Sequence, residues 1–166
     1  MNPLELPPMD AIRRNHALEH ATINVLTERH PALRLLGRSD WEGFTLYGSV
    51  TTDAVIKALS DAWQRLSAGE KQLAIHPRCG TNLTTGLVLS SLVSYITLGN
   101  RKRSPLRKFL QLLIGLAVVL TLVQPLGVKL QELITTSPDV SRLRIVDIRC
   151  QKQGNVVVHR IKTVQE

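Results

Sequence analysis

Two short segments of the chain concentrate the side chain types that bind metals. They are His16-Ala17-Leu18-Glu19-His20 and His76-Pro77-Arg78-Cys79-Gly80-Thr81-Asn82. The first reads H-x-x-E-H within a helical pattern, so its two histidines lie one turn apart on one face and their rings can converge. This is the inverted zincin spacing, and zinc takes histidine nitrogen and cysteine sulfur. Because the second segment adds a histidine and a thiol, we predict one site for zinc or another divalent metal, formed by His16, His20, His76 and Cys79.

The structural explanation of each segment has to be weighed against this prediction. An isolated H-x-x-E-H in a helix is usually charged surface, and a lone buried histidine or cysteine is usually a packing residue. However, the two segments hold three of the five histidines and one of the two cysteines. His16, Glu19 and His20 also share the side of the helix that carries apolar residues, where an imidazole or carboxylate is costly unless a partner satisfies it. The pairing of the segments therefore favours a metal site.

The role of Cys79 separates two classes of function. If the thiol does not bind, three histidines leave one position open for water, as in catalytic zinc sites, and Glu19 is placed as the general base of a hydrolase, possibly a peptidase. If Cys79 closes the site, the metal is structural and the protein acts in assembly or scaffolding. Weaker candidates for substrate binding follow Cys79 or lie beside it: Arg78, Thr81 and Asn82.

The same residues carry a resemblance to known families. His16-x-x-Glu19-His20-x-Thr22-Ile23 followed by His76-Pro77-Arg78-Cys79-Gly80-Thr81 resembles the signature of the YqhQ-like bacterial membrane proteins. The stretch from Asn15 to Ile23 is closer to a smaller uncharacterised membrane-protein family, mostly from photosynthetic bacteria, with the same two boxes. The resemblance covers under half of the chain and implies a metal-dependent membrane enzyme. The chain has Asn82 where YqhQ-like proteins usually have serine.

The distribution of charge argues against a nucleic-acid partner. The 166 residues carry a net charge of +8 with only 4% aromatic residues. Residues 1–82 are balanced, while the excess of eight divides into five charges within 101–108 and three within 129–166. A nucleic-acid binder spreads basic residues over one face with aromatic partners. A short basic loop between apolar segments is instead typical of membrane topology.

Two uncharged apolar runs flank this basic loop and predict a transmembrane helical hairpin over residues 83–128. The first run, 83–98, contains many hydroxyl residues, which suit close helix contact, and the second, 109–128, is twenty uncharged residues long. The expected partner is therefore the lipid bilayer, together with an unknown substrate or membrane-protein partner. A buried soluble hairpin is the alternative. The basic loop favours the cytoplasmic side, whereas the N-terminal residues lack a secretory signal, so the membrane orientation stays open.

The rest of the chain predicts an α+β fold in three parts. A metal-binding region spans 1–82, the hairpin spans 83–128 with its basic loop at 99–108, and a C-terminal β-hairpin tail at 129–166 packs on the N-terminal region. Within the first part, Asp10 is expected to cap a helix over 11–29. Further elements are expected at 33–36 (strand), 44–47 (strand), 52–66 (helix) and 73–75 (strand). The tail carries strands at 143–149 and 156–161 around Gly154-Asn155, with His159 expected at the surface.

Overall fold

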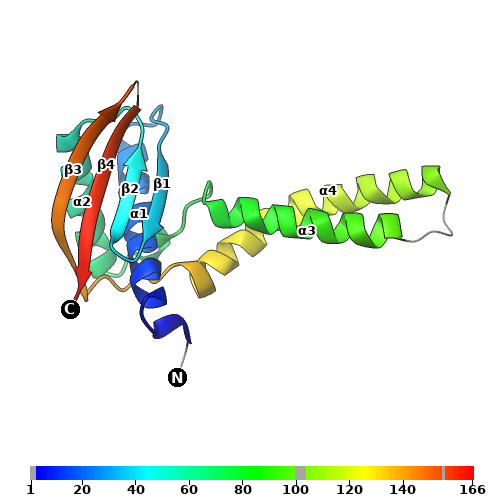
Figure 1. Ribbon diagram of the computed structural model, residues 1–166, viewed down its shortest axis with the longest axis horizontal. Helices are drawn as coiled ribbons and strands as arrows, with labels where there is room; N and C mark the ends of the chain where they lie inside the picture. The colour runs from blue at the N-terminus through cyan, green and yellow to red at the C-terminus, as the bar shows by residue number, and fades with distance from the viewer. Residues whose placement is uncertain (1–2, 100–103, 155) are drawn as a thin grey trace. The chain divides into compact units, whose positions relative to one another are not determined.

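The computed structural model describes residues 3–99, 104–154 and 156–166 (Figure 1). The chain forms two compact units. Residues up to His76 fold together with Glu132–Glu166, and Pro77–Gln131 forms the second unit. The fold is α+β, as the sequence predicted, because a four-stranded antiparallel sheet and two long helices make the first unit. Among its described residues, the second unit is helical except for residues 77–79 and Ser104.

Two amphipathic helices and one sheet enclose the core of the first unit. Helix α1 (Met9–Arg29) follows a 3-10 turn, η1 (Pro3–Glu5), and helix α2 (Thr52–Ser67) packs beside it. Both helices lie on the same face of the sheet (Figure 1). Their apolar side chains meet Phe44, Leu46 and Ile161, each fully buried. The core is therefore the layer of apolar side chains between the hydrophobic stripes of the two helices and one face of the sheet.

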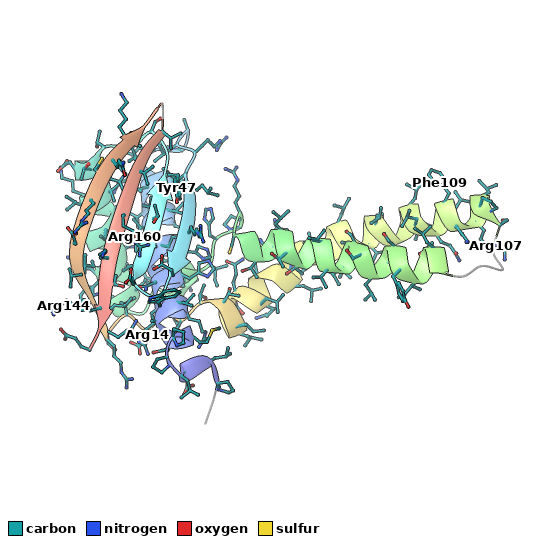
Figure 2. All side chains as sticks on the ribbon, viewed as in Figure 1. Arg14, Tyr47, Arg107, Phe109, Arg144 and Arg160 are labelled. Carbon is teal, nitrogen blue, oxygen red and sulfur yellow. The ribbon has the colours of Figure 1, made fainter. Side chains whose placement is uncertain are left out.

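The sheet joins strands from the two ends of the chain. Its order is β1-β2-β4-β3, with β1 (Leu36–Asp40), β2 (Gly43–Tyr47), β3 (Leu143–Gln153) and β4 (Val156–Gln165). In β2, buried Phe44 and Leu46 alternate with half-buried Thr45 and Tyr47, as predicted for a strand with one face on the core. On the opposite face, Arg160 of β4 reaches Asp40 of β1 with two hydrogen bonds of 2.8 Å (Figure 2).

Several local predictions are wrong in informative ways. The first strand lies at Leu36–Asp40 and not at 33–36, so Gly37, Ser39 and Asp40, which fall between the two predicted strands, are strand residues. The segment at 73–75 is not a strand, because Leu73 and Ala74 end a 3-10 turn, η2 (Lys71–Ala74), and Ile75 follows it. Asp10 does not cap α1, which begins at Met9; its carboxylate pairs with Arg14 at 2.8 Å. His159, expected at the surface, is fully buried.

The second unit is an antiparallel pair of apolar helices, α3 (Gly80–Gly99) and α4 (Pro105–Leu130). Glycines let the helices approach closely, since a Cβ at Gly115 would meet Val93 Cγ1 at 2.5 Å and one at Gly86 would meet Val123 at 3.1 Å. A π-helical turn, η3 (Gln131–Thr135), follows α4 in the chain, and the first unit resumes at Glu132. Of the predicted basic loop, residues 100–103 lie outside the described residues, as does Asn155 of the predicted C-terminal turn.

Both helices of this unit are long and apolar enough to cross a membrane. Large apolar side chains point outward along them: Leu83 and Tyr95 are each 79% exposed and Leu120 is 75% exposed. Phe109, near the start of α4, is also exposed (Figure 2). Such continuous apolar surface marks a site of contact with another apolar phase or partner.

Candidate metal centre

Helix α1 presents three site residues at intervals of four, His16, His20 and Asn24. Residues four apart on a helix share a face, so the two imidazoles lie one turn apart, with ring centroids separated by 4.2 Å and ring planes tilted by 59°. The ring of His76, which follows η2, lies 5.7 Å from that of His20. His20 is buried, while His16 and His76 are half-buried. The first unit thus gathers the three histidines that the sequence singled out.

The hydrogen bonds of these histidines fix which ring nitrogen carries the proton. His16 Nδ1 lies 3.0 Å from the carbonyl oxygen of Thr135, and His20 Nδ1 lies 2.8 Å from that of Ala74. His76 Nδ1 lies 2.8 Å from Asn24 Oδ1. Because each partner is a carbonyl oxygen that only accepts, each Nδ1 must donate. In the neutral ring, Nε2 is then the nitrogen with the lone pair, which is the arrangement of metal-binding histidines.

Asn24 is a site residue that the sequence reasoning missed. Its amide nitrogen donates to the carbonyl oxygens of Leu73 and Ile75, both at 2.9 Å, which orients its Oδ1 toward His76. One asparagine therefore holds the backbone on both sides of Ala74, whose carbonyl accepts from His20. The available signal was its spacing, since Asn24 continues the four-residue series of His16 and His20.

Glu19 is buried against the edge strand β1. Ser39 donates its hydroxyl hydrogen to Glu19 Oε2, and a Cβ added at Gly37 would overlap the Glu19 carboxylate. Burial raises the pKa of the Glu19 carboxyl, while the Ser39 hydrogen bond and the nearby His16 oppose this rise. Glu19 is therefore a desolvated carboxyl with one fixed oxygen, seated in a notch that exists because residue 37 has no side chain.

The remaining predicted residues lie at the start of α3 in the second unit. Cys79 directly precedes this helix, and its sulfur accepts from the Thr81 backbone N–H at 3.4 Å and donates to the Thr81 hydroxyl at 3.3 Å. Thr81 and Asn82 lie inside the first turn of this helix. Arg78 is exposed. A cysteine at a helix N-terminus is placed where the helix dipole stabilises a thiolate.

Asn82 connects α3 to α4 within the second unit. Its amide nitrogen donates to Pro77 O at 2.7 Å and to Gln124 Oε1 at 3.2 Å, and its oxygen accepts from Gln131 at 2.9 Å. A Cβ at Gly127 would overlap this carboxamide. The structure thus gives Asn82 a helix-pairing contact, whereas its expected part in substrate binding, like those of Arg78 and Thr81, stays a prediction.

These residues define a class of protein: an α+β unit with a histidine cluster on its first long helix, joined to a two-helix apolar hairpin. The chain belongs to the family described as Domain of unknown function (DUF6391), whose model matches residues 11–148. It is also 37% identical over 135 residues to an uncharacterised protein of Picosynechococcus sp.. That alignment covers 76% of this chain and 66% of the relative, so the chain spans just under two thirds of that relative's length.

No solved structure matches the chain. The matched family range includes both metal-type segments and both apolar helices. The relation to the YqhQ-like proteins stays a prediction.

Proposed function

We propose that this protein is a membrane-embedded, metal-dependent hydrolase, peptidase-like in its chemistry, in which His16 and His20 hold a zinc ion or another divalent metal. One observation carries the proposal: His16, His20 and His76 each donate Nδ1–H to a carbonyl oxygen. Packing alone has no need for three histidines in one tautomer. A metal site does, because each ligating Nε2 must keep its lone pair and the ring must be held in direction.

The second metal-type segment supplies the rest of the donor set. Cys79 of this segment is the thiol that we propose as a further donor beside His16 and His20 of α1. Cys79 follows His76 by three residues, so an extended chain carries its Cα no more than about 11 Å from that of His76. Histidine nitrogen and cysteine sulfur are both zinc ligands. We propose that His16 and His20 are the constant ligands and that His76 or Cys79 completes the site.

Glu19 is the proposed general base. When bound, a divalent metal lowers the pKa of a coordinated water and polarises a substrate carbonyl. Glu19 precedes His20 directly in the H-x-x-E-H segment, where the inverted zincin spacing places the base. The hydroxyl of Ser39 holds one of its oxygens, and its buried position strengthens it as a proton acceptor. The chain's own residues thus supply the proton transfer and the orientation of the ligands.

The apolar hairpin is proposed to place this chemistry at a membrane. The exposed apolar surface of α3 and α4 suits lipid acyl chains, and both helices are long enough to span a bilayer. Asn82, Gln124 and Gln131 satisfy one another between the helices, as polar groups in a membrane must. The lipid bilayer is therefore the partner that we propose for this unit.

A structural metal site in an assembly protein is the second candidate. The contacts of Glu19 favour it, because the bond from Ser39 and the notch at Gly37 already explain a buried carboxyl without any catalytic role. If Cys79 and His76 both ligate, the site is closed to water and resembles structural zinc sites. The two candidates differ in what Glu19→Gln does.

Metal content, measured with activity on the same preparation, tests the proposal. The full chain should resist carbonate extraction from membranes and, purified in detergent, contain about one zinc ion. Glu19→Gln should keep the zinc and lose hydrolysis of a fluorogenic peptide library by about 10²–10⁴-fold, because only the base is removed. Glu28→Gln is the matched control, as Glu28 lies exposed on the same helix.

Three outcomes would count against this assignment. Zinc loss in Glu19→Gln would make Glu19 a ligand or an essential support of one, and the general-base role would be wrong. Cobalt-substituted protein with a thiolate charge-transfer band, absent in Cys79→Ser, together with no hydrolysis by the wild type, would establish the structural candidate. Recovery of the protein in the soluble fraction without detergent would refute the membrane role of the hairpin.

A further inference from the structure

The part of the turn η3 that belongs to the first unit is held by two side chains of α1. The last carbonyl groups of any helix lack partners within that helix. In η3 and just after it, four successive carbonyls point at two residues of α1: those of Leu133, Ile134 and Thr136 at Arg13, and that of Thr135 at His16. Residues from Glu132 onward belong to the same compact unit as α1.

Arg13 makes most of these contacts. Its Nε donates to Ile134 O at 2.7 Å, and one terminal nitrogen donates to Thr136 O at 3.0 Å and to Leu133 O at 3.4 Å. The other terminal nitrogen donates to Leu4 O at 3.3 Å. The backbone adds a further bond, from Ser137 N–H to Arg13 O at 3.0 Å. A planar guanidinium with donors in a fixed fork is suited to fixing several carbonyls at once.

The carbonyl that Arg13 does not bind is the one that orients His16. Thr135 lies between Ile134 and Thr136, whose carbonyl oxygens Arg13 holds on either side, and Thr135 O accepts the His16 Nδ1–H at 3.0 Å. Displacement of this turn would therefore remove the acceptor that keeps the His16 proton on Nδ1. π-Helical turns such as η3 are frequent at functional sites, where they adjust the direction of backbone groups.

We infer that Arg13 is a positioning residue through which the turn η3 sets the metal affinity of His16. The inference rests on the proposed metal role of His16. The coupling is reciprocal. If an ordered η3 raises the metal affinity of the site, metal binding must stabilise the ordered η3 by the same free energy. A metal bound by His16 should thus stabilise the turn, and a shift of the turn should weaken the metal.

Arg13→Gln in the full chain tests this coupling. We expect its zinc dissociation constant, measured in detergent by competition with a fluorescent chelator, to rise by about 10–100-fold, the usual cost of losing an outer partner of a metal ligand. Arg13→Lys keeps the charge but lacks the forked donors of the guanidinium. Its zinc dissociation constant should lie between those of the wild type and Arg13→Gln. Arg29→Gln is the matched control, since it removes an exposed arginine from the end of the same helix, where it pairs with Asp61.

Amide hydrogen exchange over residues 131–137 gives a readout that loss of stability alone would not reproduce. Zinc should slow exchange there in the wild type and in Arg29→Gln, and should have little effect on it in Arg13→Gln. Wild-type zinc affinity in Arg13→Gln would overturn the coupling while leaving the metal site intact. A wild-type protein that binds no zinc would overturn the metal site itself, so the two failures are distinguishable.

Discussion

Replacing Asn24 by alanine separates the ligand role of His76 from its packing role. Asn24 makes three hydrogen bonds, to His76 Nδ1 at 2.8 Å and to the carbonyls of Leu73 and Ile75 at 2.9 Å. Asn24→Ala removes all three at once without touching a histidine. The 3-10 turn then loses its attachment to α1, and His76 loses the acceptor that keeps its proton on Nδ1.

The magnitude follows from these bonds. A typical intramolecular hydrogen bond contributes about 0.5–1.5 kcal/mol net. Three such bonds sum to roughly 1.5–4.5 kcal/mol, and because Asn24 is half-buried, water replaces part of them, so we expect destabilisation of about 2 kcal/mol. If His76 binds the metal, zinc affinity should fall by a further factor of about 10–100.

Asn15→Ala is the matched control. Asn15 lies on the same helix, donates to Asp40 O at 2.9 Å and accepts from the Thr163 hydroxyl at 2.7 Å, and contacts no site histidine through these bonds. Both variants should lower the melting temperature, yet only Asn24→Ala should weaken zinc binding in a chelator competition. Equal zinc affinity in the two variants would refute a ligand role for His76 and leave Cys79 as the donor that completes the site.

Two further predictions concern residues outside the metal site, His159 in the sheet and Gly115 in the helical hairpin. Burial lowers the pKa of His159 below its ordinary value, and its Nδ1 has no hydrogen-bond partner among the described residues, so the folded state carries fewer protons than the unfolded state. Stability should thus fall as pH drops below about 6.5, and His159→Gln should show a smaller loss of melting temperature between neutral and acidic pH; an unchanged slope would contradict this. Gly115→Leu should clash with Val93 and destabilise the hairpin by about 1–3 kcal/mol in detergent melting, whereas Leu120→Ile on the exposed surface should not.

The sequence alone determined the features that depend on local spacing. Histidines four apart in a helical pattern must share a face, so the pairing of His16 with His20 followed from the helix period. The two uncharged runs were long enough for membrane-length helices, and the structure places helices there. Strand β2 was also predicted correctly, because its alternating apolar and polar residues match the alternation of buried and half-buried positions.

The structure overturned predictions wherever a distant partner decides the conformation. The leucine-rich run at 33–36 suggested a strand, but β1 is Leu36–Asp40, which is mostly polar. Its positions Gly37 and Ser39 receive the Glu19 carboxylate instead of apolar side chains. The segment around Ala74 forms a 3-10 turn, in which the carbonyl of Leu73 accepts a hydrogen bond from Asn24 and that of Ala74 accepts one from His20.

Only the tertiary structure decided how the site is oriented. The tautomers of the three histidines depend on the carbonyls of Ala74 and Thr135 and on the Asn24 amide, which are 54, 119 and 52 residues from the rings that they hold. Every residue has the same backbone carbonyl, so no sequence pattern predicts which carbonyl will accept a hydrogen bond from a histidine. The sequence could therefore indicate which side chains gather at the site, while folding set the direction of each lone pair, through backbone carbonyls for His16 and His20 and through the Asn24 side chain for His76.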